Sequence, residues 1–215
     1  MADAKMAGST LVGTEFLDAL ASSAPTPGGG GASAYCGALA AALSSMVGNL
    51  TTGKKRYADV EPQVQEHLAQ LEDLRARLVQ LVDADAEAFA PLAAAYRMPK
   101  ETPEEQAAKE AALQAALVEA TRVPLVIMRC AAEVFDHAEF MARFGSRLAV
   151  SDAGVSAAFA CAAVEGASLN VLVNAASLAD KDAAQAYLEE CEALCATARA
   201  RSAALLEYVR SEISS

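Results

Sequence analysis

The stretch ASAYCGALAAALSSMVGNL, residues 32–50, contains no Asp, Glu, Lys or Arg and is rich in alanine, serine and glycine. Its length alone would permit a membrane span. Small and polar residues such as Ser44, Gly48 and Asn49 dilute its hydrophobicity and allow other helices to pack closely on every side. The stretch therefore predicts a central, buried helix and no membrane span.

A second, nearly uncharged run of the same kind is GASLNVLVN, residues 166–174. Two helices this apolar and this rich in small residues have more surface to bury than the amphipathic helices of one chain need to cover. We therefore predict that two copies associate as a homodimer. A symmetric dimer would also offer a cleft between subunits, where a flat ligand could lie.

The rest of the chain has the periodicity of amphipathic helices. A short helix is expected over residues 11–21, ended by the Pro/Gly loop at 22–31. Asp59 is a plausible N-cap for a long helix, whose apolar stripe has steps of three and four and continues to Phe89. Pro91 can kink this helix, and MPK at residues 98–100 ends it.

The segment TPEE at residues 102–105 reads as a capping box with proline at the first helical position, so a fourth helix should start there. It runs to about Phe144 with a kink near Pro124, and Ser151 and Asp152 are expected to cap a fifth helix. A last helix should cover residues 182–213. Together these signals predict an all-α fold, an up-and-down bundle of about five or six helices with two buried, small-residue-rich helices, forming a single domain over residues 1–215 and dimerising.

Composition narrows the function classes. Of the 215 residues 54% are apolar but only 5% are aromatic, with no Trp, which suits closely packed helices better than a sheet sandwich. The net charge of −11, without a basic stripe, disfavours nucleic acid as a partner. An anionic small molecule would have to meet a few cations concentrated at its site.

The five cysteines are odd in number and lie mostly within apolar helical patterns, so we expect them to be reduced core residues. Only two histidines are present, which disfavours a metal site. Asp3, Glu15 and Asp18 interrupt the first segment, so no secretory signal is recognised and a cytoplasmic location is expected.

Two segments near the uncharged helix could bind a ligand. The loop PTPGGGG, residues 25–31, precedes that helix, so its free N–H groups could admit the polar edge of a ligand, although it could equally be a bare helix start. Lys54, Lys55 and Arg56 follow the helix and reverse the sign of the charge locally. They could serve a site, or they could simply complement the helix dipole.

Asp85 continues the apolar stripe of its helix, so its carboxylate should face the core, where it becomes a candidate general acid or base. Asp83 and Glu87 point elsewhere on the helix and should be solvated. Asn170 and Asn174 are one turn apart in an apolar run, and each amide needs either a partner helix or a ligand. His67 and His137 are expected to be isolated, with surface or satisfied roles.

Taken together, six segments resemble the cyclodeaminase/cyclohydrolase family, and the ordered set covers nearly the whole chain. They are APTPGGGGASA (24–34), SMVGNLTTGKKRY (45–57), DADAEAF (83–89), MPKET (98–102), SDAGVSAA (151–158) and GASLNVLVN (166–174). The family typically has Gly-Asn where this chain has Gly145-Ser146, and often Ser at Gly31. The resemblance implies an all-helical homodimer that acts on folates.

The leading activity that the resemblance implies is hydrolysis of the methenyl bridge of 5,10-methenyltetrahydrofolate to 10-formyltetrahydrofolate, with no cofactor beyond the tetrahydrofolate itself. Formiminotetrahydrofolate cyclodeamination is the alternative, and a non-catalytic, folate-binding helical dimer is a third. The expected catalytic residues are Asp85, Lys54 and Lys55. Substrate binding is expected from Pro27, Gly28, Gly29, Gly30, Asp152 and Asn170.

Overall fold

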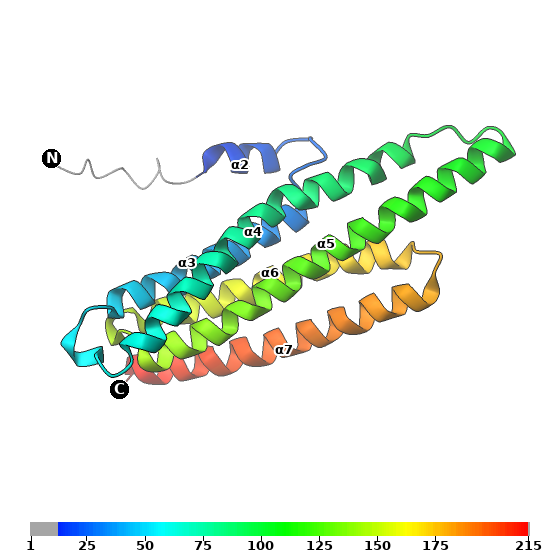
Figure 1. Ribbon diagram of the computed structural model, residues 1–215. Helices are drawn as coiled ribbons and strands as arrows, with labels where there is room; N and C mark the ends of the chain where they lie inside the picture. Colours follow the sequence, from blue (N-terminus) through cyan, green and yellow to red (C-terminus); the bar gives the residue numbers. More distant parts are fainter. Residues whose placement is uncertain (1–12, 215) are drawn as a thin grey trace.

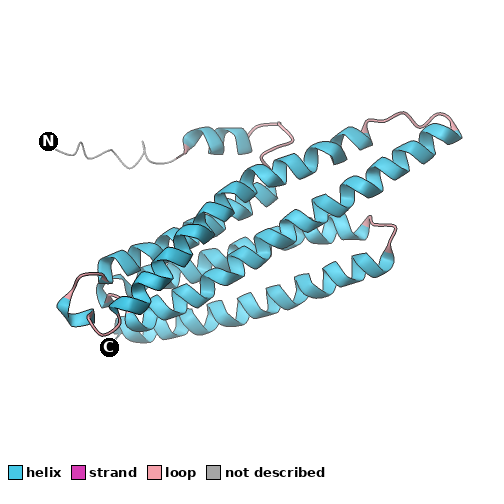
Figure 2. Ribbon diagram, viewed as in Figure 1, coloured by secondary structure: helices cyan, strands magenta, loops and turns pink. Residues whose placement is uncertain are grey.

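The computed structural model describes residues 13–214, and within that range helices joined by loops make up the chain, with no strand (Figures 1 and 2). Leu11 and Val12 of the first predicted helix lie outside the described residues. The elements are α2 (Thr14–Leu20), α3 (Gly29–Thr51), the 3-10 turn η1 (Lys55–Tyr57), α4 (Glu61–Tyr96), α5 (Pro103–Phe144), the 3-10 turn η2 (Arg147–Ala149), α6 (Val150–Ala176) and α7 (Lys181–Ser214).

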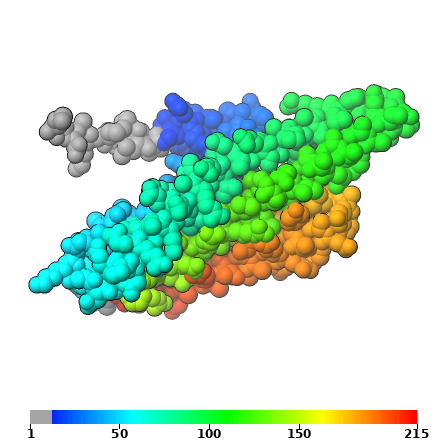
Figure 3. All heavy atoms as spheres, viewed as in Figure 1, coloured from blue at the N-terminus to red at the C-terminus, as the bar shows by residue number. Residues whose placement is uncertain are grey.

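The five long helices form an up-and-down bundle, as the sequence predicts. Helices α3, α4, α5 and α6 each pack on their chain neighbours, α3 also packs on α6, and α7 lies against α5 and α6. The short helix α2 has no buried residue and touches α3 through the rings of Phe16 and Tyr35, whose centroids are 5.2 Å apart. The hairpin of α4 and α5 is the longest part and projects beyond the other helices (Figures 1 and 3).

Small residues on α3 allow its neighbours to approach closely. A Cβ atom added at Gly48 would lie 2.7 Å from Leu68 and 2.9 Å from Met141, and one added at Gly37 would lie 3.0 Å from Leu78. The glycines therefore make room for side chains from α4 and α5, which is the role that the composition of residues 32–50 predicts.

The predicted burial of α3 and α6 is only partly seen in a single chain, because each helix has many buried residues but keeps a row of apolar side chains exposed. Leu39 and Met46 on α3 are each 40% exposed, and Leu169 and Val173 on α6 are 63% and 69% exposed. By length and composition alone, α3, α5 and the segment Arg147–Ala176 could each cross a membrane. In this fold about half of each apolar segment is already buried against other helices.

The helix boundaries test the predicted capping signals. Thr102 accepts a hydrogen bond from the Glu105 N–H, and Glu105 returns one to the Thr102 N–H, so the predicted capping box is confirmed. Asp59 does not cap α4, which begins at Glu61 beside Pro62, a residue whose fixed φ suits a first turn.

The predicted cap at Ser151 and Asp152 is also wrong. The 3-10 turn η2 leads directly into α6, which begins at Val150, so both residues already lie in its first turn. No side chain caps this helix. Helix α3 begins at Gly29, three residues earlier than predicted, because a carboxylate from another helix meets its first turn, as described below.

The two histidines, expected to be isolated, pair between α4 and α5. Their Nδ1 atoms are 2.8 Å apart, and the His67 ring stacks on Phe140 at a centroid distance of 4.0 Å. One ring must donate and the other accept, so the pair requires at least one neutral imidazole. Burial lowers the pKa of both histidines below the ordinary value of 6.5.

We predict that this pair makes the fold sensitive to mild acid. Because the folded pKa values are lowered, the stability that the pair contributes is present above pH 6.5 and is lost as the pH falls through the lower folded values. The thermal unfolding temperature, followed by circular dichroism, should fall between pH 7 and pH 5. His67→Gln, which cannot gain a proton, should flatten this dependence, and equal slopes for the two proteins would contradict the prediction.

Candidate functional site

A cleft of about 250 Å³ lies where the loop before α3 meets α4, α5 and α6. Its lining includes the backbone of Gly28 and Gly29, the carboxylate of Asp85 and the amide of Asn170. The remaining lining residues are Pro25, Thr26, Phe89, Ala120, Pro124, Val173 and Asn174. The fold thus brings together four residues that the sequence analysis assigned to a site from three separate segments.

Among residues 13–214, Asp85 is the only ionisable side chain that lines this cleft, and the first turn of α3 holds it. Its Oδ2 accepts a hydrogen bond from the Gly31 N–H at 2.9 Å, so it satisfies one of the free N–H groups of the helix start. The carboxylate lies directly over Gly30, where any added Cβ would overlap it. At position 30, therefore, only glycine leaves room for the Asp85 carboxylate.

Two opposing effects act on the Asp85 carboxyl. Burial raises its pKa above the ordinary value of 3.8, and the hydrogen bond from the Gly31 N–H partly offsets that rise. Asp83 and Glu87, on either side in the sequence, are exposed, as predicted. A half-buried carboxyl with a raised pKa, aimed into a cleft, has the properties of a general acid or base.

The two asparagines of α6 have different roles. Asn174 donates to the Ala120 carbonyl at 2.6 Å. That carbonyl has no helical partner, because the residue four positions later is Pro124, which lacks an N–H. The Asn170 amide makes only a long contact, 3.4 Å, with the Gly166 carbonyl, and it lies beside Gly29. Asn170 is therefore the asparagine available to a ligand.

Sequence reasoning missed Phe89, Ala120 and Pro124 as parts of the site. Phe89 follows Asp85 by one helical turn and was assigned only to the apolar stripe. The signal for Ala120 was present in the sequence, because a proline inside a helix always frees the carbonyl four residues earlier. Which side chain would meet that carbonyl could not be read from the sequence.

Several predicted site residues lie elsewhere. Pro27 is not among the residues that line the cleft, and its Cβ lies 3.7 Å from where a Cβ at Gly31 would be. Lys54 and Lys55 follow the opposite end of α3, whose 23 residues separate its two ends by about 35 Å at 1.5 Å per residue. Asp152 lies in the first turn of α6, 18 residues before Asn170, or about 27 Å away along the helix. Within one chain, these three charged residues do not share a site with Asp85.

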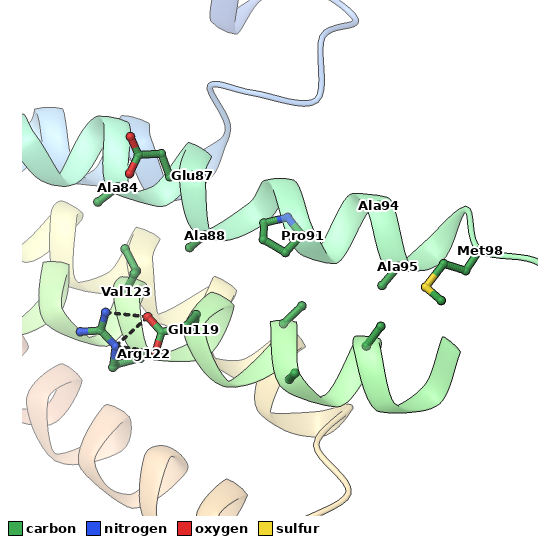
Figure 4. A pocket seen from close by; sticks show the side chains of 13 residues that line it. Ala84, Glu87, Ala88, Pro91, Ala94, Ala95, Met98, Glu119, Arg122 and Val123 are labelled. Atoms are coloured by element: carbon green, nitrogen blue, oxygen red, sulfur yellow. Dashed lines mark hydrogen bonds and ion pairs between the residues drawn. The ribbon is translucent and has the colours of Figure 1, made fainter. Parts of the chain in front are cut away.

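A larger groove of about 660 Å³ runs between α4 and α5, on the projecting part of the hairpin (Figure 4). Alanines line most of it, and its cation, Arg122, is directed at Glu119, with Nη2 to Oε2 at 2.6 Å. This pairing leaves no unpaired cation in the groove to orient an anionic ligand. The smaller cleft, with its inward carboxylate and free backbone and amide groups, is the better candidate for chemistry.

Among residues 13–214, no cluster of three or more His, Cys, Asp or Glu side chains is placed to hold a metal ion. All five cysteines are free thiols, as expected. Burial raises the pKa of Cys191 to about 11, so this thiol is not a nucleophile at neutral pH.

Comparison with known proteins gives consistent matches. Residues 13–193 match the family model described as formiminotransferase-cyclodeaminase. The chain is 48% identical to the methenyltetrahydrofolate cyclohydrolase of Methylorubrum extorquens, over 97% of this chain and 100% of that protein. It is 33% identical to the formimidoyltransferase-cyclodeaminase of Rattus norvegicus, over 77% of this chain but only 30% of that longer protein.

A solved structure, the formiminotetrahydrofolate cyclodeaminase of Thermotoga maritima, has the same fold. It superposes with a TM-score of 0.83 at 32% sequence identity, covering 95% of this chain and 98% of that one. The similarity in fold therefore extends over nearly the whole of both chains.

Proposed function

Because this chain belongs to the formiminotransferase-cyclodeaminase family, we propose that it is a methenyltetrahydrofolate cyclohydrolase, which converts 5,10-methenyltetrahydrofolate to 10-formyltetrahydrofolate. The observation that carries this choice within the family is the 48% identity to a cyclohydrolase over nearly the full length of both chains. The two cyclodeaminase relatives described above are more distant, at 33% and 32% identity.

The chemistry needs one group that can hold and release a proton. The methenyl carbon lies between two nitrogens in a cationic amidinium, so water can add to it once a base takes the water's proton. The new C–O bond gives a tetrahedral carbinolamine. Cleavage of the bond from this carbon to N5 then needs a proton on N5. As that bond breaks, the hydroxyl loses its remaining proton to solvent and becomes a carbonyl, so the carbon stays on N10 as a formyl group.

Asp85 is the residue that we assign to both proton transfers. As a carboxylate it accepts the proton of the attacking water, and as a carboxylic acid it returns that proton to N5. Its raised pKa suits this exchange, because an ordinary aspartate holds a proton too weakly to act as an acid near neutral pH. The backbone of Gly28 and Gly29 would lie along the pterin edge, with the Asn170 amide as a hydrogen-bonding partner.

Cyclodeamination of formiminotetrahydrofolate is the second candidate, favoured by the close structural match to the Thermotoga maritima cyclodeaminase. Both reactions act on the same carbon, so the cleft alone does not separate them. A third possibility is a folate-binding dimer without catalysis.

The test is to incubate the purified protein separately with methenyl- and formimino-tetrahydrofolate, and to follow methenyl absorbance and ammonia. We expect loss of methenyl absorbance above the spontaneous rate and no ammonia. Ammonia release from the formimino substrate would make the protein a cyclodeaminase, and tight binding without turnover of either folate would support the non-catalytic role.

We expect the enzyme to act as a homodimer, which is supported by the exposed apolar surface of α3 and α6. The hydrolysis uses only water and the folate, so no cofactor or metal is required by the proposed steps. The cytoplasm is the expected location, where tetrahydrofolates and reduced cysteines would coexist.

A further inference from the structure

Helix α3 carries a stripe of apolar side chains that the rest of residues 13–214 leaves partly exposed. Leu39, Met46 and Leu50 are 40–42% exposed and lie on this stripe. The full stripe, here called the α3 stripe, consists of Ala32, Cys36, Leu39, Leu43, Met46 and Leu50. Its steps alternate between four and three residues, which is the spacing with which one helix packs along another.

Helix α6 has a matching row beside it. The α6 stripe consists of Val155, Phe159, Ala162, Gly166, Leu169 and Val173, again with steps of four and three. The two helices are in direct contact, since the Cys36 thiol donates to the Phe159 carbonyl at 3.4 Å and Ser44 bonds Ser156 at 2.8 Å. Together the two stripes form one uncharged face, the kind of surface that marks an association site.

The cleft at one end of this face is incomplete in a single chain. Its volume of about 250 Å³ is below the roughly 300–1,000 Å³ of typical small-molecule sites. Within the part of the chain that the structure describes, its lining has a carboxylate, Asp85, but no Lys, Arg or His to meet the glutamate carboxylates of a folate. The Arg122 guanidinium nearby in sequence is already held by Glu119.

The opposite end of the same face has cations without partners. Among residues 13–214, neither Lys54 nor Lys55 forms a hydrogen bond or ion pair through its side chain, and both are exposed. They lie about 35 Å from Asp85 along α3, far beyond the screening length of roughly 8 Å at physiological salt. The charges of these lysines are therefore largely screened from the cleft of their own chain.

We propose that a second copy of the chain covers the α3 and α6 stripes with its α3 running antiparallel, and that the partner's Lys54 and Lys55 complete the cleft around Asp85. The α3 stripe is centred near Ala41. A two-fold axis at that level, perpendicular to the helix, places Gly29 opposite the partner's Gly53, because each is 12 residues from the centre. The partner's lysine pair then follows directly at the mouth of the cleft.

The positions of the charged residues favour the antiparallel dimer over a dimer in which the two copies of α3 run parallel. A two-fold axis parallel to the helices would keep α3 of both copies parallel, place the two Lys54-Lys55-Arg56 clusters at the same end, and leave both Asp85 clefts without a cation. The antiparallel pairing places each cluster beside a carboxylate instead. This inference rests on the proposed folate activity, and it assigns to the partner's lysines the binding of the substrate's glutamate carboxylates.

The test uses dimers assembled from two differently tagged chains, with kcat/KM measured on methenyltetrahydrofolate. One chain carries Asp85→Asn and the other carries Lys54→Met with Lys55→Met. Each homodimer should be impaired, the lysine variant by about tenfold or more, as expected for loss of charge-assisted bonds. The mixed dimer should recover about half of the wild-type value, because one of its two sites then has Asp85 and both lysines.

A reciprocal dimer sharpens the result. When all three substitutions are on one chain and the other chain is wild type, neither site is intact, so activity should stay low. If each lysine pair instead completed the cleft of its own chain, this reciprocal dimer would have one intact site and half of the wild-type activity. The first mixed dimer would then have no intact site, and its activity would stay low. That reversed pattern would overturn the inference while leaving the cyclohydrolase assignment in place.

Two other outcomes are also decisive. A mass of 22.2 kDa by light scattering, the mass of one chain, would exclude the shared site. An unchanged kcat/KM in the homodimer with Lys54→Met and Lys55→Met would also exclude the shared site. The matched control for loss of a positive charge is Lys100→Met, because Lys100 is exposed on the loop between α4 and α5. If the wild-type protein turned over no folate, the proposed function itself would be overturned, and this result differs from all of those above.

Discussion

Asp85→Asn should lower kcat for methenyltetrahydrofolate hydrolysis by about 100-fold or more, the range expected for loss of a general acid–base group. Asparagine keeps an oxygen that can accept the Gly31 N–H, so the start of α3 should remain intact. It cannot accept a proton from water or return one to N5. Steady-state kinetics would measure the loss, and a decrease below about tenfold would remove Asp85 from the acid–base role.

The matched control is Asp83→Asn, which removes an exposed carboxylate two residues away and should leave kcat near the wild-type value. The pH profile of the wild-type enzyme adds a second readout. Because burial raises the pKa of Asp85, the acidic limb of kcat/KM should lie above the ordinary aspartate value of 3.8. The limb should be absent from the residual activity of Asp85→Asn.

Asp85→Asn, which should lower activity, should leave thermal stability unchanged or raise it. A carboxyl whose folded pKa is raised favours the fold fully below its unfolded pKa, and this contribution is lost as the pH rises through the folded value. At pH 7 the ionised Asp85 therefore costs stability, and Asp85→Asn should unfold at the same or a higher temperature than wild type. A lower unfolding temperature would indicate that Asp85 serves mainly to hold the helix start.

Gly30→Ala should also reduce activity strongly, although it adds only a methyl group. That methyl would overlap the Asp85 carboxylate, which must then move away from Gly31. Misplacing a catalytic group by about 1 Å can cost on the order of 100-fold. We therefore expect kcat to fall by roughly 10- to 100-fold, while far-ultraviolet circular dichroism stays that of a helical protein.

Gly31→Ala is the control for this substitution. An added Cβ there would be 3.5 Å from the Val82 carbonyl oxygen, an ordinary contact, and the backbone N–H that binds Asp85 is retained. Its loss of activity should be much smaller than that of Gly30→Ala. Equal losses in the two variants would show that helix-start packing, rather than the position of the carboxylate, governs the rate.

Helix identity and order were predictable because their signals lie in contiguous residues. The Thr102 capping box, the periodicity leading to Asp85 and the stop at Gly145 each depend on local chemistry, and all three are confirmed. The caps expected at Asp59 and Asp152 were wrong because a neighbouring proline and a 3-10 turn shifted the helix starts. Such shifts depend on competition between adjacent signals of similar strength.

The candidate site was predicted in part. An inward-facing Asp85 followed from helical periodicity alone, and the glycine loop was recognised as a close-approach element. The grouping of Lys54 with that loop was wrong within one chain. The length of the predicted helix between them already ruled it out. About twenty helical residues between two segments hold them roughly 30 Å apart, however near they are in the sequence.

The sequence by itself determined which segments are helical, in what order they follow, and that Asp85 faces inward, since these properties depend on residues a few positions apart. Tertiary structure alone decided that Asp85 caps the helix start at Gly31, 54 residues away, and that Gly30 lies beneath its carboxylate. It also decided that Asn174 meets the Ala120 carbonyl while Asn170 faces the cleft. These contacts depend on how whole helices pack, and packing is set by side chains that are remote from one another in the sequence.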